Sequence, residues 1–415
     1  TMIMGELGLT GEIRPIRGVL PLVLAARRAG LKNVIVAPEN GAEAALVEGI
    51  SVYCPQNLRQ TYECLHRATP LPQYIAGETH QTGEIYPKDM SEISGQLVAR
   101  RALEIAASGA HNLLFVGPPG SGKTMLAQRL PTILPRLSFD EALEVTALYS
   151  VSGNLGNRSL IETRPFRAPH HSVSDVGLVG GGSISPKPGE ISLAHHGVLF
   201  LDELPEFKRT VLEVLRQPLE DGSINITRRL QSVRFPSQFM LVASMNACPC
   251  GNLGSNLKRC MCRSETIEMY QSRISGPLLD RIDIQLEVAE VSYDDLLRHE
   301  SAEPSARVRE RVEACRALQA RRFAGTPIRC NAQMSVREVR EYCKLDDAGH
   351  EVMRRVVDKL GMSARAHHRI LKVARTIADM DEKPRIAKKH LAEAIALRTL
   401  DKKRYQCSEP YDVAR

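Results

Sequence analysis

The sequence predicts an α/β protein with a parallel sheet at its centre and a helical C-terminal part. From Ser91 onward, short apolar runs alternate with helix-like segments, as in a parallel sheet covered by helices. After about residue 290 the strand-like runs stop, and 305–322 and 365–379 show clear helical periodicity. The first 70 residues carry a separate, smaller α/β pattern, with a helix predicted at 20–29 and a strand at 33–37.

A length of 415 residues is too great for one compact core and predicts several domains. The segment that separates the two α/β patterns is polar, contains several glycines and prolines, and lacks periodicity, so we interpret it as a linker. The expected division is a small α/β domain at 1–70, a linker at 71–90, a sheet domain at 91–290, a helical connector at 291–330, a helical lid at 331–405 and a tail at 406–415.

The composition is that of an ordinary globular protein, with 43% hydrophobic and 25% charged residues. No apolar stretch approaches membrane-spanning length and no leader opens the chain, so we expect a cytoplasmic protein without a membrane partner. The chain begins inside an apolar run at 2–4, which suggests that a further segment precedes it. A net charge of +7 suits a polyanionic partner but does not require one.

A phosphate-binding loop follows the apolar run 111–116 and precedes a helix-like segment at 125–130. Its glycines let backbone N–H groups surround phosphates, and the helix N-terminus adds positive potential. Lys123 is expected to reach the β- and γ-phosphates of ATP, and the Thr124 hydroxyl to bind Mg²⁺. The loop residues are Gly117, Pro118, Pro119, Gly120, Ser121, Gly122, Lys123 and Thr124.

Two further apolar runs end in polar residues that complete such a site. The run 198–201 ends at Asp202 and Glu203, at the carboxyl edge where α/β sheets bind ligands. We assign Asp202 to Mg²⁺ and Glu203 to general-base activation of the attacking water. The run 239–244 leads to Asn246, whose amide can orient that water.

Four cysteines lie within fifteen positions: Cys248, Cys250, Cys260 and Cys262. Four thiolates can close a tetrahedral structural zinc site. The pairs are tighter than the commoner spacing with two intervening residues, so reduced structural cysteines remain the alternative.

Long strings around these motifs resemble the ComM/YifB family of magnesium-chelatase-like AAA+ proteins. They comprise 109–112 before the loop, 164–171, 188–195 before the acidic strand, and 275–281. The resemblance covers essentially the entire chain. It implies a homo-hexameric ring and an inserted segment at about 160–195 that projects toward the pore.

The resemblance also implies two arginines with catalytic roles. Arg281 matches the arginine finger that reaches into the neighbouring subunit's site, and Arg365 matches the sensor-2 arginine of the helical lid. A finger supplied in trans offsets charge in the transition state. A surface salt bridge is the alternative for both residues.

Residues 224–235 predict a hairpin, because β-type residues alternate on both sides of a basic tip. Arg228, Arg229 and Arg234 can meet DNA phosphates by charge without reading sequence. A solvated turn is the alternative.

The first residues, 5–18, resemble the C-terminal part of a Lon-type protease domain. In proteolytic members the following helix carries the catalytic lysine, whereas here 19–24 contains none. Without a base to activate a serine, peptidase activity is disfavoured. The resemblance therefore implies a partial, degenerate Lon-like domain.

Together these features predict an ATP-dependent hexameric DNA motor. The resemblance implies helicase and branch-migration activity on single-stranded and branched DNA, extending heteroduplex during natural transformation. The alternative is an ATPase that remodels a protein partner, as chelatase and MoxR-type proteins do. The chain has no tryptophan and few aromatic residues, so base stacking gives no independent support for DNA binding.

Overall fold

A computed structural model provides the structure of the chain. It describes residues 1–66, 72–75, 86–156, 158–182, 186–228, 231–255, 258–290, 303–360, 363–398 and 400.

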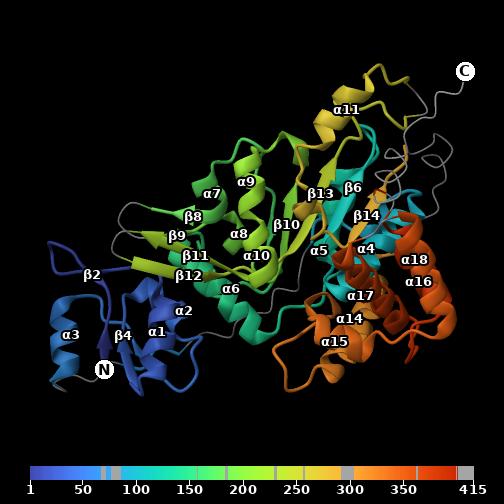
Figure 1. The fold of residues 1–415 in the computed structure, drawn as a ribbon. Coiled ribbons are helices and arrows are strands. Elements are labelled where there is room, and N and C mark those ends of the chain that lie inside the picture. The colour runs from blue at the N-terminus through green and yellow to red at the C-terminus, as the bar shows by residue number, and fades with distance from the viewer. Residues whose placement is uncertain are drawn as a thin grey trace, which may run out of the picture.

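The centre of the molecule is a five-stranded sheet in the order β14-β6-β13-β10-β7, and every neighbouring pair is parallel (Figure 1). Its strands are β6 (Leu113–Val116), β7 (Phe166–Arg167), β10 (Val198–Leu201), β13 (Met240–Met245) and β14 (Ile284–Glu287). In the four longest strands nearly every residue is buried, because helices cover both faces. The predicted α/β fold with a parallel sheet is confirmed.

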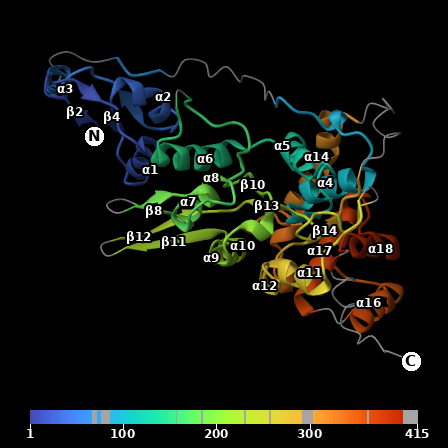
Figure 2. The same cartoon turned by 90° about the horizontal axis from the view of Figure 1, so that it is seen from above.

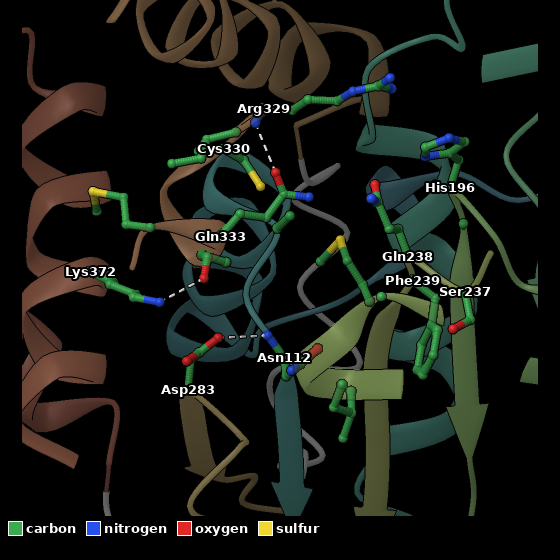
Figure 3. Close-up of a pocket in the computed structure, with 18 of the residues that line it drawn as sticks. Asn112, His196, Ser237, Gln238, Phe239, Asp283, Arg329, Cys330, Gln333 and Lys372 are labelled. Carbon is green, nitrogen blue, oxygen red and sulfur yellow. Dashed lines mark hydrogen bonds between the residues drawn. The ribbon is translucent and has the colours of Figure 1, made fainter. Parts of the chain in front are cut away.

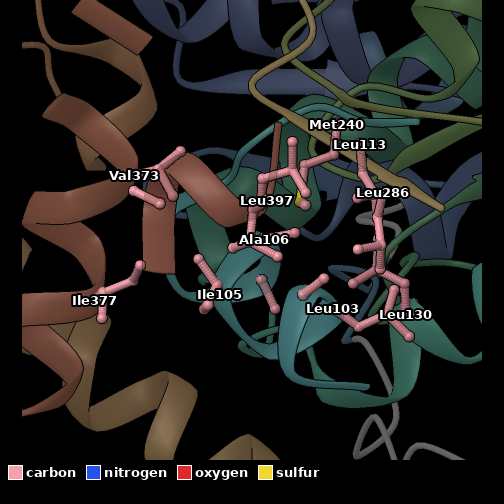
Figure 4. Close-up of a cluster of buried hydrophobic side chains, with 14 of the residues drawn as sticks. Leu103, Ile105, Ala106, Leu113, Leu130, Met240, Leu286, Val373, Ile377 and Leu397 are labelled. Carbon is pink, nitrogen blue, oxygen red and sulfur yellow. The ribbon is translucent and has the colours of Figure 1, made fainter. Parts of the chain in front are cut away.

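Successive residues of β6 belong to different cores, because side chains alternate between the two faces of a strand. Leu113 and Phe115 join one core, and Leu114 and Val116 join the other. The first core also contains side chains from the helical C-terminal part, such as Ile377 (Figure 4). The sheet and the C-terminal helices therefore share one hydrophobic core.

The helices and short 3-10 turns of the sheet domain surround this sheet (Figure 2). They are η2 (Met90–Glu92), α4 (Leu97–Gly109), α5 (Lys123–Ile133), α6 (Phe139–Ser152), α7 (Asp175–Val179), α8 (Glu190–Leu193), η3 (Leu204–Glu206), α9 (Arg209–Val214), α10 (Arg216–Asp221), α11 (Ser264–Gln271) and α12 (Gly276–Leu279). The C-terminal part contains α14 (Ser305–Arg322), η4 (Asn331–Gln333), α15 (Val336–Tyr342), α16 (Asp347–Leu360), α17 (Ala364–Met380) and α18 (Lys388–Ala396). None of the described helices is both long enough and apolar enough to cross a membrane.

Two small antiparallel ribbons extend from the sheet domain and lie side by side in Figures 1 and 2. They are β8 (Gly180–Gly181) with β9 (Lys187–Pro188), and β11 (Ser223–Arg228) with β12 (Gln231–Pro236). The predicted hairpin at 224–235 is thus present. The expected insertion at 160–195 does not extend over the whole of that range. Phe166 and Arg167 pair with β10 and form the edge strand of the main sheet. Two residues in register with a core strand belong to the sheet, so the extra segment lies between β7 and β10.

The N-terminal unit contains a three-stranded parallel sheet in the order β1-β4-β5. Its elements are β1 (Met2–Ile3), β2 (Glu6–Leu7), β3 (Ile13–Arg14), α1 (Val19–Arg28), β4 (Asn33–Ile35), η1 (Pro38–Asn40), α2 (Gly41–Ala44), β5 (Ser51–Tyr53) and α3 (Leu58–Leu65). Its small core is joined by Leu143 and Ala147 of α6, and the Gly18 N–H donates to Ser150 Oγ at 3.0 Å. The unit is therefore packed against α6 of the sheet domain.

Candidate active site

The phosphate loop connects the end of β6 to the start of α5. Gly120 and Gly122 have φ angles of 79° and 83°, a left-handed conformation that glycine adopts without steric cost. They turn the chain so that α5 begins at Lys123, with its helix N-terminus at the loop. This is the strand, loop and helix arrangement that binds phosphates.

The Lys123 ammonium is held at the centre of this loop. It donates to the carbonyl oxygens of Gly117 and Pro118, both at 2.8 Å, and lies 3.3 Å from Asn246 Oδ1. Burial lowers the pKa of Lys123, and the nearby carboxylates of Asp202 and Glu203 oppose that shift. The sequence-predicted lysine and asparagine are thus brought together, although Lys123 follows β6 through the loop and Asn246 follows β13.

Asp202 is linked to two hydroxyl groups. Thr124 Oγ1 donates to Asp202 Oδ2 at 2.7 Å, and Ser244 Oγ donates to Asp202 Oδ1. A hydroxyl and a carboxylate oxygen this close form a pair of hard ligands suited to Mg²⁺, which prefers oxygen. The residues predicted to hold the metal therefore meet at the carboxyl edge of β10 and fit that ion.

Glu203, the residue after Asp202, has an unusual backbone conformation and an exposed carboxylate. Its φ of 53° is left-handed, which is uncommon for a residue with a side chain and is concentrated at functional sites. The side chain is 56% exposed, and Glu203 Oε2 lies 3.7 Å from His171 Nδ1. An exposed carboxylate beside the phosphate loop can accept a proton from a water that attacks the γ-phosphate.

Three residues of this site were not assigned from the sequence. Ser244 binds Asp202, His171 faces Glu203, and Gln96 Nε2 donates to Ala289 O at 2.6 Å beside the phosphate loop. Ser244 stands at the end of the apolar run before Asn246, and His171 ends the string 164–171, so both could have been singled out by position. The partner of Gln96 is 193 residues away, and nothing in the sequence indicated it.

The four clustered cysteines converge directly after β13. The Sγ atoms of Cys248, Cys250 and Cys260 lie 3.4 to 3.7 Å apart, and all four cysteines bring their Sγ atoms within 4.8 Å of one another. Tetrahedral zinc with Zn–S bonds of about 2.3 Å places sulfur atoms about 3.8 Å apart. The donor set therefore fits zinc. The segment between the cysteine pairs also passes close to the phosphate loop, since a Cβ at Gly251 would lie 2.7 Å from Pro119.

A second group of metal-ligating types, Glu144 with His195 and His196, does not fit a metal. Its ligand atoms lie within 4.8 Å of one another. However, the Gln238 N–H donates to His195 Nδ1 at 3.0 Å, so that nitrogen is an acceptor and the ring proton is on Nε2. His195 Nε2 therefore donates to Glu144 Oε2 at 3.0 Å, and a protonated nitrogen cannot ligate a metal.

Arg281 lies at the opposite edge of the sheet from the phosphate loop. It precedes β14, its backbone carbonyl accepts from Asn112 Nδ2 at 3.0 Å, and Asn112 precedes β6. Because β6 and β14 are parallel, both residues are at the amino edge, whereas the loop follows the carboxyl end of β6. Arg281 is thus not brought to the Lys123 site of its own chain.

Arg365 belongs to the first turn of α17 and is exposed. One turn further along this helix, Arg369 forms an ion pair with Asp283 at 2.9 Å, again at the amino edge. Arg281 and Arg369 therefore lie at the same edge of the sheet, and Arg365 lies on the turn of α17 that precedes Arg369.

The predicted DNA-contacting arginines lie on the ribbon β11–β12. Arg234 is exposed, and its Nε donates to Ser223 Oγ at 2.9 Å. Arg228 ends β11, but its side chain lies outside the described residues, as does Arg229.

A phosphate loop, an acidic pair on a neighbouring parallel strand and a helical C-terminal unit define a P-loop ATPase of the AAA+ type. Residues 89–296 match the family described as magnesium chelatase, subunit ChlI, and residues 302–398 match its C-terminal family. Residues 1–40 match a third family, subunit ChlI of Mg-chelatase.

Similar proteins place the chain in one family within the AAA+ class. The chain is 45% identical to competence protein ComM of Haemophilus influenzae over 403 residues, covering 96% of this chain and 77% of ComM. It is 42% identical to YifB of Salmonella typhimurium over 405 residues, with the same coverage of both chains. A weaker similarity, 26% over 147 residues, links it to Lon protease 2 of Bacillus subtilis, covering 34% of this chain and 27% of that protein. The chain belongs to the ComM/YifB family.

Proposed function

We propose that this chain is a cytoplasmic DNA motor that forms a hexameric ring and couples ATP hydrolysis to branch migration. It would extend heteroduplex in homologous recombination during natural transformation. The relation to a competence protein supports a role in DNA processing. The observation that carries the ring is the separation of Lys123 and Arg281 to opposite edges of one sheet. An active site that needs both must form between two subunits.

In this proposal one subunit contributes the ATP site and the next contributes the arginines. Lys123 holds the β- and γ-phosphates, Thr124 and Asp202 hold Mg²⁺, and Glu203 accepts a proton from the attacking water, which Asn246 orients. Mg²⁺ supplies charge neutralisation of the phosphates. Arg281 and Arg365 of the neighbouring subunit offset the charge that develops on the γ-phosphate.

A mixing experiment tests the shared site. Arg281→Ala and Lys123→Ala variants should each lack ATPase activity, whereas a mixture of the two should regain part of it. In mixed rings, intact loops of the Arg281→Ala subunits meet intact arginines of the Lys123→Ala subunits. If the mixture stays inactive although mixed hexamers form, the arginine does not act between subunits.

A forked or three-strand DNA substrate tests the motor. The wild-type protein should displace a strand with ATP and Mg²⁺, and Lys123→Ala should not. A wild-type hexamer that hydrolyses ATP without binding DNA or displacing a strand would refute the DNA assignment.

The match to magnesium chelatase subunits favours one alternative, an ATPase that remodels a protein partner. The two functions differ in their response to DNA. Stimulation of ATPase by DNA that is lost when Arg228 and Arg229 are replaced by serine would support the motor, and DNA-insensitive turnover would support the alternative.

We also propose that the four clustered cysteines hold a structural zinc ion. The spacing and convergence of their four sulfur atoms support this proposal. Elemental analysis should find about one zinc per subunit in the wild type. Cys260→Ser should lower the zinc content, whereas Cys343→Ser, a buried cysteine elsewhere, should not. A folded, zinc-free wild type would exclude the site.

A further inference from the structure

Arg281 is withdrawn into its own subunit. The residue is only 5% exposed, its Nη1 donates to Pro277 O at 2.6 Å, and its Nη2 is paired with Glu220 Oε1. Because Arg281 is buried and held on both terminal nitrogens, its remaining N–H groups are not presented to a phosphate of another chain. If Arg281 completes a neighbour's site, it must first leave these partners.

The burial of Arg281 is incompletely compensated. Within the part of the chain that the structure describes, Arg281 Nε is a buried N–H group with no acceptor. Leaving such a donor without a partner destabilises the withdrawn position, because the N–H group has lost its water and gained no acceptor. The side chain of Arg281 is therefore held in its buried position by two partners. These are the Pro277 carbonyl and the Glu220 carboxylate.

Glu220 is the anchor that can move. Its side chain is 51% exposed, and it lines a cavity of about 710 Å³ at the amino edge of the sheet. Figure 3 shows this cavity between the C-terminal helices, with Lys372, and the sheet, with Asn112 and Asp283. Pro277, by contrast, belongs to α12, which is continuous with the short turn that carries Arg281. The carboxylate sits on a separate element with open space beside it.

That element leads directly into the ribbon proposed to contact DNA. Glu220 is the fifth residue of α10, Gly222 ends this helix in a left-handed conformation with φ of 62°, and β11 begins at Ser223. A force that tilts the ribbon is thus transmitted to Glu220 through two intervening residues. No other described carboxylate forms an ion pair with Arg281.

We propose that Glu220 is a positioning residue that retains Arg281 until the β11–β12 ribbon is loaded. A polyanionic strand on the ribbon displaces α10, breaks the Glu220–Arg281 pair and frees Arg281 for the ATP of the adjacent subunit. This inference rests on the proposed function, because it assumes that Arg281 acts between subunits. It adds a physical connection between the DNA-contacting ribbon and the arginine.

Glu220→Gln tests the inference, because glutamine keeps the shape of the side chain and removes its charge. Without DNA, the variant's kcat for ATP should rise about fivefold, the factor that corresponds to a partly exposed ion pair of about 1 kcal/mol. The KM for ATP should stay unchanged, and the kcat with saturating single-stranded DNA should equal that of the wild type. Glu220→Asp, with a retracted carboxylate, should be intermediate.

The matched control is Glu213→Gln on α9, which removes a carboxylate paired with Arg216 at 2.8 Å on the same segment. It should leave the ratio of DNA-stimulated to basal turnover unchanged. A Glu220→Gln protein with wild-type thermal stability and unchanged or reduced basal kcat would overturn the inference. Should that variant fold poorly, the Glu220→Asp protein gives the same decision.

The double variant Glu220→Gln/Arg281→Ala separates this inference from the proposed function. The single variant Arg281→Ala and the double variant should be equally inactive, because Glu220 acts only through Arg281. If Arg281→Ala alone retains full turnover, the proposed role of the arginine fails. If it loses turnover while Glu220→Gln changes nothing, only the coupling fails.

Discussion

The two edges of the central sheet differ in what their polar side chains do. At the carboxyl edge, Thr124 and Ser244 both donate hydrogen bonds to Asp202, and Glu203 is more than half exposed. At the amino edge, Asp283 is 1% exposed and is enclosed by His111 and Arg369. The same sheet therefore carries an accessible polar site at one end and a buried ionic cluster at the other.

This difference separates catalysis from stability. Polar groups at the carboxyl edge cost little to keep accessible and can exchange their partners for phosphate, metal and water. In the cluster around Asp283 at the amino edge, burial makes a broken pair costly, because a desolvated charge is left behind. We therefore expect substitutions in the carboxyl-edge site to alter turnover, and substitutions in the buried cluster around Asp283 to alter stability.

The largest effect is expected for Glu203→Gln. Loss of the general base should lower kcat for ATP by about 1000-fold while ATP binding and thermal stability remain. Steady-state ATPase and nucleotide-binding assays measure this. Glu206→Gln, a partly exposed neighbour that pairs with Arg273, is the control and should retain turnover. A comparable loss in both variants would contradict the assignment of Glu203.

Arg369→Ala should lower the free energy of unfolding by about 3 kcal/mol, because it leaves the buried Asp283 carboxylate without its cation. Although burial alone raises the pKa of Asp283, Arg369 and His111 hold that pKa well below its usual range. Denaturant titration provides the measurement. Arg354→Ala removes an exposed pair with Glu351 and should cost less than about 1 kcal/mol. Equal costs would erase the contrast between the edges.

Acidification should weaken the amino edge through His111. Burial lowers the pKa of His111 below the ordinary 6.5, and the hydrogen bond that His111 donates to Asp283 opposes this shift. Below about pH 6.5 the unfolded chain therefore binds a proton that the folded chain does not, and stability falls with pH by about 1.4 kcal/mol per unit. The Asp283 contribution persists in this range, because it is lost only at lower pH.

His111→Gln isolates this contribution, since glutamine can still contact Asp283 and Thr376. Between pH 7.5 and 5.5 the free energy of unfolding should fall less for this variant than for the wild type. The slopes against pH should differ by about one proton bound on unfolding. Identical pH profiles for the two proteins would show that His111 does not titrate on unfolding.

The smallest effect is expected on the ribbon. Arg234→Ser should weaken DNA binding about threefold at low salt, because one phosphate contact is lost. The slope of the logarithm of the binding constant against the logarithm of the salt concentration should decrease by about one. Fluorescence anisotropy at several salt concentrations measures both. Arg59→Ser, which removes an exposed arginine of α3, should change neither. An effect of equal size at Arg59 would indicate a diffuse charge effect.

Much of the carboxyl edge could be predicted from the sequence. Lys123, Thr124, Asp202, Glu203 and Asn246 all follow apolar strands, and parallel strands deliver the residues after them to one edge. The helices at 305–322 and 365–379 were also predicted nearly to the residue, because long amphipathic segments have a strong period. The two-residue strand β7 was missed, since a strand that short has no period to detect.

The sequence by itself determined the class of this protein, because a phosphate loop and its acidic partner are local patterns with a fixed chemistry. It also determined the sheet, through fully apolar runs that only a sheet covered on both faces can bury. The tertiary structure alone decided which groups meet across long separations, such as Gln96 with Ala289 and Asp283 with Arg369.

The tertiary structure also decided the position of Arg281. Its proposed role as an arginine finger follows from the family resemblance of its string, but its ion pair with Glu220, 61 residues away, could not be predicted. Ion pairs of this kind depend on the direction of strands and helices in three dimensions, whereas a sequence records only the order of residues along the chain.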